Sequence, residues 1–282
     1  MTIIAASIEY KRILLIADCR VTLPDGQLHD ALQKVYPFGP HAVVAFSGSV
    51  GLASSALQEM VRGKGNKSKQ KLDTLTRQLS RITDRKARHR CKKGETASGC
   101  SYIIAGYAGQ TPYLASVTVD GRRDPRIEMT REVGGHSVIG SGESERDACQ
   151  HAISGSDLEK FSDDQAAFAL SGFIDAAMSL STMSKRFNTG IGDLKMHFVI
   201  RPEGWWFVPM HTEMFRGRIS DRNKPLGYAP VHSVVYDEPL SRFVLQEHQS
   251  GSSYPLASAL SRNPYDLRGT VKADFDPYTL RA

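Results

Sequence analysis

Short apolar runs and helical repeats alternate along the chain and predict the order of its elements. Strands are predicted at 2–8, 12–23 and 41–46, then at 101–105, 112–119, 126–130 and 137–142. Between these groups, apolar residues recur at helical spacing over 52–61 and again over 72–82. Two more helices are predicted at about 143–153 and 163–187, followed by strands at 194–200 and 205–208.

This order of strands, two helices, strands, two helices and strands indicates an α+β fold. Two helix pairs that cover two antiparallel sheets form a four-layer αββα sandwich, whereas a doubly wound sheet would need strict alternation of strands and helices. Residues 202–282 hold 8 of the 13 prolines and show weak periodicity. We therefore expect a domain at 1–210 and a C-terminal extension at 211–282 that is partly extended and ordered only against a neighbouring subunit.

The composition is that of a folded globular chain, with 40% apolar and 23% charged residues among 282. No apolar run approaches the roughly 20 residues of a membrane span, and the first residues lack the pattern of a signal peptide. The four cysteines show no CxxC spacing and are too few for a disulfide scaffold. Free thiols in a reducing cytoplasm are the expectation, with no role at a membrane.

Positive charge is concentrated in one segment. Residues 62–93 hold 13 Lys or Arg and two acidic residues, a balance of +11, so an overall charge of +6 leaves −5 for the rest. Such a patch can be a solvated helix face or can attract an anionic partner. No aromatic residue lies within the segment, so bases would find no stacking platform, which argues against nucleic acid as the partner.

Thr2 is a candidate nucleophile. If Met1 is removed, the Thr2 hydroxyl can attack a carbonyl while its own α-amine, with an intrinsic pKa of about 7.7–8.0, accepts the proton. Asp18 at the end of an apolar strand and Lys34 after a polar loop could form a buried pair beside that hydroxyl. Taken one by one, each of the three is better explained by an ordinary structural role.

Two glycine turns precede predicted helices. Gly48 lies between the strand at 41–46 and the first helix, and Gly140-Ser141-Gly142 precedes the third helix. Glycine allows close approach of the backbone to a ligand, and amides at a helix N-terminus can face an oxyanion. A plain strand-to-helix turn with a serine N-cap is the simpler interpretation of each turn.

The conjunction of these residues is more specific than any of them alone. The pattern "TIIAAS…LLIADCRVT…K…VVAFSGS…IGSG" resembles the N-terminal-nucleophile (Ntn) hydrolases of the proteasome β-subunit type over about residues 2–208. Archaeal and eukaryotic β-subunits carry an acid and a serine near the end of the last long helix, and 188–193 does not show that pair clearly. This absence places the resemblance nearest the bacterial HslV-like branch.

The resemblance implies a role for each site residue. Thr2 would be the nucleophile, Asp18 and Lys34 the activating pair, the Gly48 amide the oxyanion hole, and Ser141 a proton-transfer partner near the Thr2 amine. Arg20 matches the basic residue that follows the aspartate in the family. The wall of the substrate pocket would consist of Val21, Leu32, Phe46 and Val50. This chemistry requires neither a metal nor an organic cofactor.

These implications predict a threonine endopeptidase in stacked homo-oligomeric rings that cleaves peptides or unfolded proteins. An ATPase or cap could dock on the basic 62–93 face. Two alternatives stay open at this point. One is a small-molecule Ntn amidase with the same nucleophile, and the other is an inactive Ntn-fold binding protein.

Overall fold

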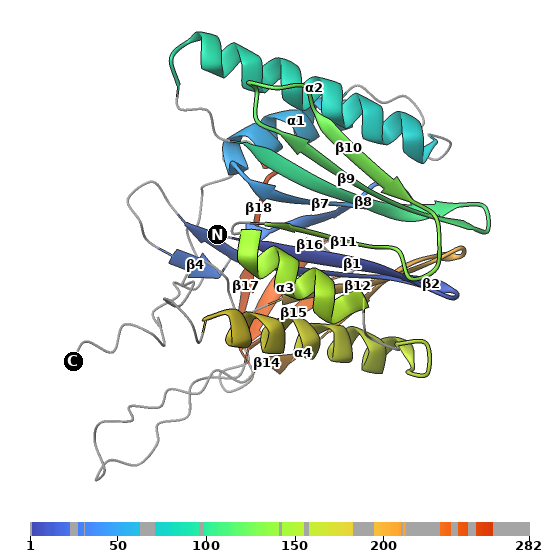
Figure 1. Cartoon of the computed structure of the whole chain (residues 1–282). Coiled ribbons are helices and arrows are strands. Elements are labelled where there is room, and N and C mark those ends of the chain that lie inside the picture. Colours follow the sequence, from blue (N-terminus) through green and yellow to red (C-terminus); the bar gives the residue numbers. More distant parts are fainter. Residues whose placement is uncertain are drawn as a thin grey trace.

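Two helix pairs enclose two antiparallel sheets in four layers, as Figure 1 shows. Helices α1 (Val50–Arg62) and α2 (Leu72–Lys92) cover one sheet, while α3 (Glu143–Ser154) and α4 (Asp163–Thr182) cover the other. The predicted αββα sandwich is therefore confirmed. This computed structural model describes residues 2–22, 28–30, 32–62, 71–95, 99–140, 143–154, 158–182, 195–209, 211–212, 232–237, 242–247 and 252–261.

Each of the two large sheets has five strands. The first has the order β11-β1-β2-β12-β13, formed by β1 (Ile3–Glu9), β2 (Arg12–Asp18), β11 (His136–Gly140), β12 (Lys195–Arg201) and β13 (Gly204–Val208). The second has the order β10-β9-β8-β7-β6, formed by β6 (Val35–Pro37), β7 (Ala42–Gly48), β8 (Cys100–Ala108), β9 (Thr111–Val119) and β10 (Arg126–Thr130). All neighbours in both sheets are antiparallel.

Three apolar layers hold the sandwich together. The central layer lies between the sheets and includes Ile8 and Leu15 of one sheet and Val43 and Ile103 of the other. The two outer layers lie between each sheet and its helix pair. The inner strands are therefore buried on both faces, which explains why β1 and β2 are almost continuously apolar.

Short strands complete the fold. β3 (Arg20–Thr22) pairs with β4 (Leu28–Asp30), and β5 (Leu32–Gln33) pairs in parallel with β18 (Ala257–Ser258). A third sheet has the order β14-β15-β16-β17, formed by β14 (His211–Thr212), β15 (His232–Asp237), β16 (Arg242–Glu247) and β17 (Ser253–Pro255).

The expectation that the segment after residue 210 is ordered only against a neighbouring subunit is wrong for part of it, because that part packs on the body of the same chain. Val234, Phe243 and Leu245 of the third sheet join the central apolar layer, where Phe243 contacts the ring of Phe198 at a centroid distance of 5.7 Å. The division of the chain into a domain at 1–210 and an extension at 211–282 stays a prediction.

Helix α2 is longer than the apolar repeat over 72–82 predicts. Buried Thr83 and Ala87 continue its inner face to the last turn, and Gly94, with a φ of 76°, lies just after it. Among the helices in the described ranges, none combines the length and the apolar character of a membrane-spanning segment.

His197 is an unusual buried residue of β12. It is 2% exposed on the face of β12 that packs toward α3 and α4, and neither ring nitrogen has a hydrogen-bond partner in the described part of the chain. Burial, and secondarily the charge of Lys195, lower the pKa of His197 from 6.5 to about 3. Because the folded protein holds this ring neutral, protonation favours the unfolded chain as the pH falls below about 6.5.

We expect His197→Leu to reduce the loss of stability in acid. Between pH 7.5 and pH 5 the free energy of unfolding of the wild type should fall by about 2 kcal/mol more than that of the variant. Urea unfolding at both pH values measures this difference. The exposed His41 gives the control, since His41→Gln should follow the wild type. Equal losses of unfolding free energy in the wild type and in His197→Leu would contradict a neutral, buried His197 ring in the folded protein.

Candidate active site

The site begins where the first hairpin brings two chain positions together. Thr2 directly precedes β1 and Asp18 ends β2, and the antiparallel register pairs Ile4 with Ala17. The start of β1 therefore lies beside the end of β2. Thr2 is 8% exposed and Asp18 is fully buried, so the apolar hairpin presents one hydroxyl and one carboxylate at the same end of the sheet.

Lys34 joins these two residues from another element. It lies between β5 and β6, and its ammonium donates a hydrogen bond to Thr2 Oγ1 over 2.7 Å while it pairs with Asp18 Oδ1. The other oxygen of Asp18 accepts the Ile3 amide over 3.3 Å. A buried ion pair is stable only where further hydrogen bonds compensate for the lost hydration, and these contacts supply them. The result is a positive charge held against the Thr2 hydroxyl.

Gly48 occupies a position that excludes a side chain. It ends β7 with a φ of +92°, and a Cβ atom there would collide with the carbonyl oxygen of Gly99. Immediately after it, the Ser49 side chain accepts the Leu52 amide over 3.3 Å at the start of α1. The serine N-cap and the glycine turn are thus both present, and the positive end of the α1 dipole lies beside the site.

A small pocket of about 110 Å³ connects these groups. Its lining contains Thr2, Lys34 and Gly48, all five residues expected to bind substrate, namely Arg20, Val21, Leu32, Phe46 and Val50, and also Thr22 and Ser47. Asp18 lies directly behind Lys34. Thr22 and Ser47 were not predicted as pocket residues, since neither carries a distinguishing signal beyond its position beside Val21 or Gly48.

Ser141, expected near the Thr2 amine, lies outside the described residues. Its neighbour Gly140 pairs with Ile3 across β11 and β1, and a Cβ atom at Gly140 would collide with the Thr2 carbonyl oxygen. Gly140 therefore approaches Thr2 closely, and the role of Ser141 stays a prediction.

Comparison with known proteins agrees with the fold that carries this site. Residues 2–128 match the family model of proteasome subunits. The solved structure of Anbu, an ancestral β-subunit from Yersinia bercovieri, superposes with a TM-score of 0.53 at 14% identity, covering 73% of this chain and 86% of that chain. The family match covers a little under half of the chain and, together with the Anbu likeness, supports a fold of the proteasome β-type Ntn hydrolases. The Anbu likeness by itself shows only the fold, and a comparison with curated protein sequences finds no match.

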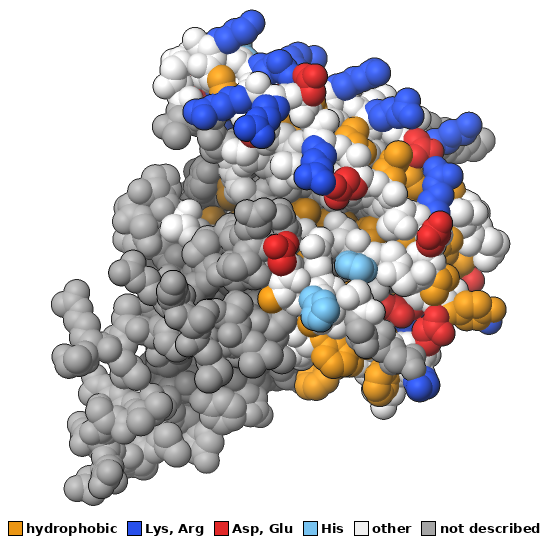
Figure 2. Space-filling model, in the orientation of Figure 1, with side chains coloured by type: hydrophobic (Ala, Val, Ile, Leu, Met, Phe, Trp, Pro, Cys, Tyr) orange, Lys and Arg blue, Asp and Glu red, His pale blue; other side chains and the backbone are white. Residues whose placement is uncertain are grey.

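Within the predicted basic segment, the described residues 71–93 lie almost entirely in α2, on one face of the molecule. Figure 2 shows Lys and Arg side chains along α2 at the top of the molecule. Several are neutralised locally: Arg85 and Lys86 both pair with Glu59, and Arg88 pairs with Asp84 and Asp124. Arg77 and Arg81 are exposed, one helical turn apart.

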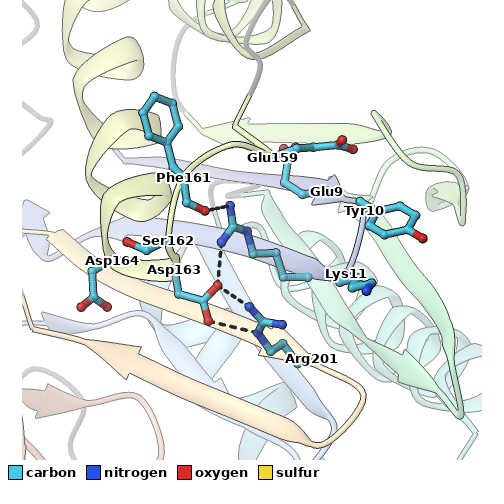
Figure 3. Close-up of a pocket in the computed structure, with 10 residues that line it drawn as sticks. Glu9, Tyr10, Lys11, Glu159, Phe161, Ser162, Asp163, Asp164 and Arg201 are labelled. Atoms are coloured by element: carbon cyan, nitrogen blue, oxygen red, sulfur yellow. Dashed lines mark hydrogen bonds and ion pairs between the residues drawn. The ribbon is translucent and has the colours of Figure 1, made fainter.

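A larger cavity of about 500 Å³ lies at the other end of β1 from Thr2, around the β1–β2 turn (Figure 3). Its centre is Asp163 at the start of α4, which accepts hydrogen bonds from Arg201 over 2.7 and 3.0 Å and from Arg12 over 2.6 Å. Arg12 is 6% exposed and also donates to the carbonyl oxygens of Leu158 and Phe161. No single feature of the sequence identifies this cluster, because its members are separated by about 40 to 190 positions.

The cluster attaches the start of α4 to the first sheet. Partial burial acts to raise the pKa of Asp163, but the hydrogen bonds and charges of Arg201 and Arg12 outweigh it and lower the pKa below its usual 3.8. We assign this cavity a structural role, since the carboxylate at its centre is occupied by two guanidinium groups of the same chain.

Asp163→Ala should lower the free energy of unfolding by about 2–3 kcal/mol at pH 7, because it leaves the buried Arg12 guanidinium without its anion. The difference should shrink as the pH falls below the usual carboxyl pKa of 3.8. Denaturant unfolding measures both effects. The neighbouring Asp164 lines the same cavity but is exposed, so Asp164→Ala should cost less than about 1 kcal/mol. Equal costs for the two variants would contradict the structural role of the cluster.

Proposed function

We propose that the protein is a threonine peptidase that cleaves peptide bonds with Thr2 after removal of Met1. The observation that carries the proposal is the contact of 2.7 Å between Lys34 Nζ and Thr2 Oγ1, with Asp18 paired to the same ammonium. An ammonium held by a buried carboxylate stabilises negative charge on the hydroxyl oxygen that it faces. It also favours the neutral form of the nearby α-amine.

The reaction follows from these positions. Thr2 Oγ1 attacks the scissile carbonyl, and its proton passes to the free α-amine of the same residue. The Gly48 amide donates to the oxyanion of the tetrahedral intermediate, with the start of α1 behind it. The protonated amine then gives its proton to the leaving amine, which leaves an ester on Thr2. Water, deprotonated by the same α-amine, hydrolyses that ester and regenerates the hydroxyl.

The pocket favours a compact apolar side chain beside the scissile bond. Four of the residues that line it are apolar, namely Val21, Leu32, Phe46 and Val50. Phe46 is held in place because it is buried and stacks on Tyr36 at a centroid distance of 6.3 Å. A pocket of about 110 Å³ leaves little room for a large aromatic side chain. The proposed substrates are peptides and unfolded proteins that carry a compact apolar side chain at the cleaved bond.

Assembly into stacked homo-oligomeric rings and a cytoplasmic location belong to the same proposal. Rings are typical of the proteasome family, and a closed chamber would restrict Thr2 to unfolded chains. A small-molecule amidase, the alternative, would use the same Thr2 chemistry but would not need to assemble into rings. A monomer or dimer in solution, measured by light scattering, would favour the amidase.

Intact mass measurement of the untagged protein tests the nucleophile. Before and after treatment with a peptide epoxyketone directed at N-terminal threonine, the wild type should show loss of Met1 and then one adduct. Thr2→Ala should form no adduct, whereas Thr74→Ala, at an exposed position of α2, should react like the wild type. Lys34→Met should slow adduct formation by about 10²-fold or more. The wild-type rate should rise with pH and level off above about pH 8, as the amine becomes neutral.

Retained Met1 with no adduct would contradict the proposal. The contact between Lys34 and Thr2 would then be architectural, and the inactive binding protein would become the preferred function.

The basic face of α2 is the proposed docking surface for an acidic partner such as an ATPase or a cap. Arg77 and Arg81 are the residues best placed for this role, because both are exposed and project from one side of α2, whereas Arg85 is paired with Glu59. Complementary charge raises association rates and salt dependence more than it raises affinity.

Reversing both charges, Arg77→Glu/Arg81→Glu, should weaken binding of a fluorescent oligoglutamate peptide by about tenfold at low salt. The wild-type affinity should fall when salt is raised, because exposed charges are screened. Fluorescence anisotropy measures both effects. The control Lys11→Glu/Arg242→Glu makes the same charge change at two exposed cations outside α2 and should bind nearly as the wild type does. Equal binding by both double variants would remove the basis for a docking surface on α2.

A further inference from the structure

The C-terminal part of the chain returns to the active site. We name residues 252–261 the C-terminal strap. Its strand β18 pairs in parallel with β5, so that Ala257 aligns with Leu32 and Ser258 with Gln33. Leu32 lines the pocket, and Lys34 is the next residue after β5. A segment more than 200 positions away in the sequence thus borders the short strand that leads into the lysine.

Three groups of contacts fix the strap in this position. The Ala259 amide donates to the Tyr36 hydroxyl over 2.6 Å, and that hydroxyl donates to the Gln33 carbonyl over 2.7 Å. The Gln58 side chain of α1 donates to the Ser261 carbonyl over 2.7 Å and to the Ala259 carbonyl over 3.4 Å. Ala257 and Ala259 are buried in the apolar layer that also holds Leu32, Tyr36 and Phe46.

Tyr36 is the link between the strap and the lysine. It is 2% exposed and follows Lys34 by two residues, in β6. Burial raises the pKa of its hydroxyl, which therefore remains a hydrogen-bond donor to Gln33 over the whole working pH range. The Tyr36 hydroxyl thus binds the strap at Ala259 and β5 at Gln33. Tyr36 follows Lys34 and Gln33 precedes it, so these bonds involve residues before and after the lysine.

The chain is held on its other side, after Lys34, where β6 pairs with β7 and the Lys34 carbonyl accepts the Phe46 amide over 3.1 Å. Before Lys34, β5 has only two residues, and the Leu32 amide donates to the Cys19 carbonyl over 2.9 Å. Strands as short as this one are not stable without neighbours. Parallel pairing with β18 supplies the missing neighbour.

We propose that the C-terminal strap is a positioning element of the active site, which holds β5 so that the Lys34 ammonium stays on Thr2 Oγ1. This inference rests on the proposed function and extends it. Because the geometry of a catalytic group must hold to within about 1 Å to keep its rate advantage, release of β5 should reduce the reactivity of Thr2. The residues of the strap act through Lys34 and do not touch the reacting atoms.

Neighbouring strap residues provide a matched pair of variants. Ala259 is fully buried against the body, and Leu260 is 37% exposed. Ala259→Glu places a charge where the strap meets the body and should lift it away, because a buried unpaired carboxylate is costly. Leu260→Glu adds the same charge one residue later, on the outer side. Gln58→Leu removes only the hydrogen bonds from α1 and serves as a milder second variant if Ala259→Glu folds poorly.

The first measurement is hydrogen exchange in the full chain, which needs no activity. Amides in peptides that cover 32–36 and 42–48 should exchange faster in Ala259→Glu than in the wild type, since they include the Leu32 and Phe46 amides. Leu260→Glu should match the wild type, and Gln58→Leu should change in the same direction by less. Unchanged exchange at 32–36 in Ala259→Glu would overturn the proposal whether or not Thr2 is reactive.

The second measurement is the reaction of Thr2 with the peptide epoxyketone, resolved into a binding constant and a maximal rate. In Ala259→Glu the maximal rate should fall by about tenfold or more, while Leu260→Glu should stay within about twofold of the wild type. A change in the binding constant alone would mean that the strap shapes the pocket through Leu32, which overturns the positioning of Lys34.

The two proposals fail in different ways. A wild type that forms no adduct refutes the proposed function, and the catalytic part of this inference falls with it. The inference alone is refuted if the wild type reacts and Ala259→Glu shows faster exchange at 32–36 but an unchanged maximal rate.

Discussion

The buried pair of Asp18 and Lys34 is the interaction on which the site depends. A carboxylate and an ammonium that are almost fully buried are stable only together, because either one alone would be an uncompensated charge in an apolar interior. The pair fixes three chain segments at one point: the start of β1, the end of β2 and the turn between β5 and β6. The position of the Thr2 hydroxyl is therefore set by electrostatics as much as by the sheet.

The two ends of the first sheet use buried charge for different purposes. At the Thr2 end, Lys34 keeps a donor on a hydroxyl that faces a pocket, so the pair is available to chemistry. At the opposite end, Asp163 is enclosed by Arg12 and Arg201, and Arg12 also donates to the backbone carbonyls of Leu158 and Phe161. Guanidinium groups of the same chain thus take three of the positions at which that carboxylate can accept a hydrogen bond. The larger cavity is therefore assigned a structural role, and the smaller one holds the proposed nucleophile.

Much of this could be predicted from the sequence, because the strongest signals are local. The apolar runs of β1, β2 and β7 and the helical repeats gave the four layers, and the spacing of Thr2, Asp18, Lys34 and Gly48 gave the candidate site. The strand boundaries differ because β3 to β6 are two or three residues long, too short for a period to show. In β12, Lys195, His197 and Arg201 alternate with apolar residues, as in a half-exposed strand, yet α4 covers that face and buries the histidine.

The contacts that complete the site could not be predicted in this way. The pairing of β18 with β5 joins positions about 225 residues apart and involves only two residues of each strand. Ala257 and Ala259, which are buried there, carry no sequence signal that would predict the pairing. The family match ends at residue 128, so it covers Thr2, Lys34 and Gly48 but not the strap that borders them. The groups proposed to react therefore lie inside the family match. The strap proposed to hold the lysine in place lies outside it, so the two parts of the site carry different sequence signals.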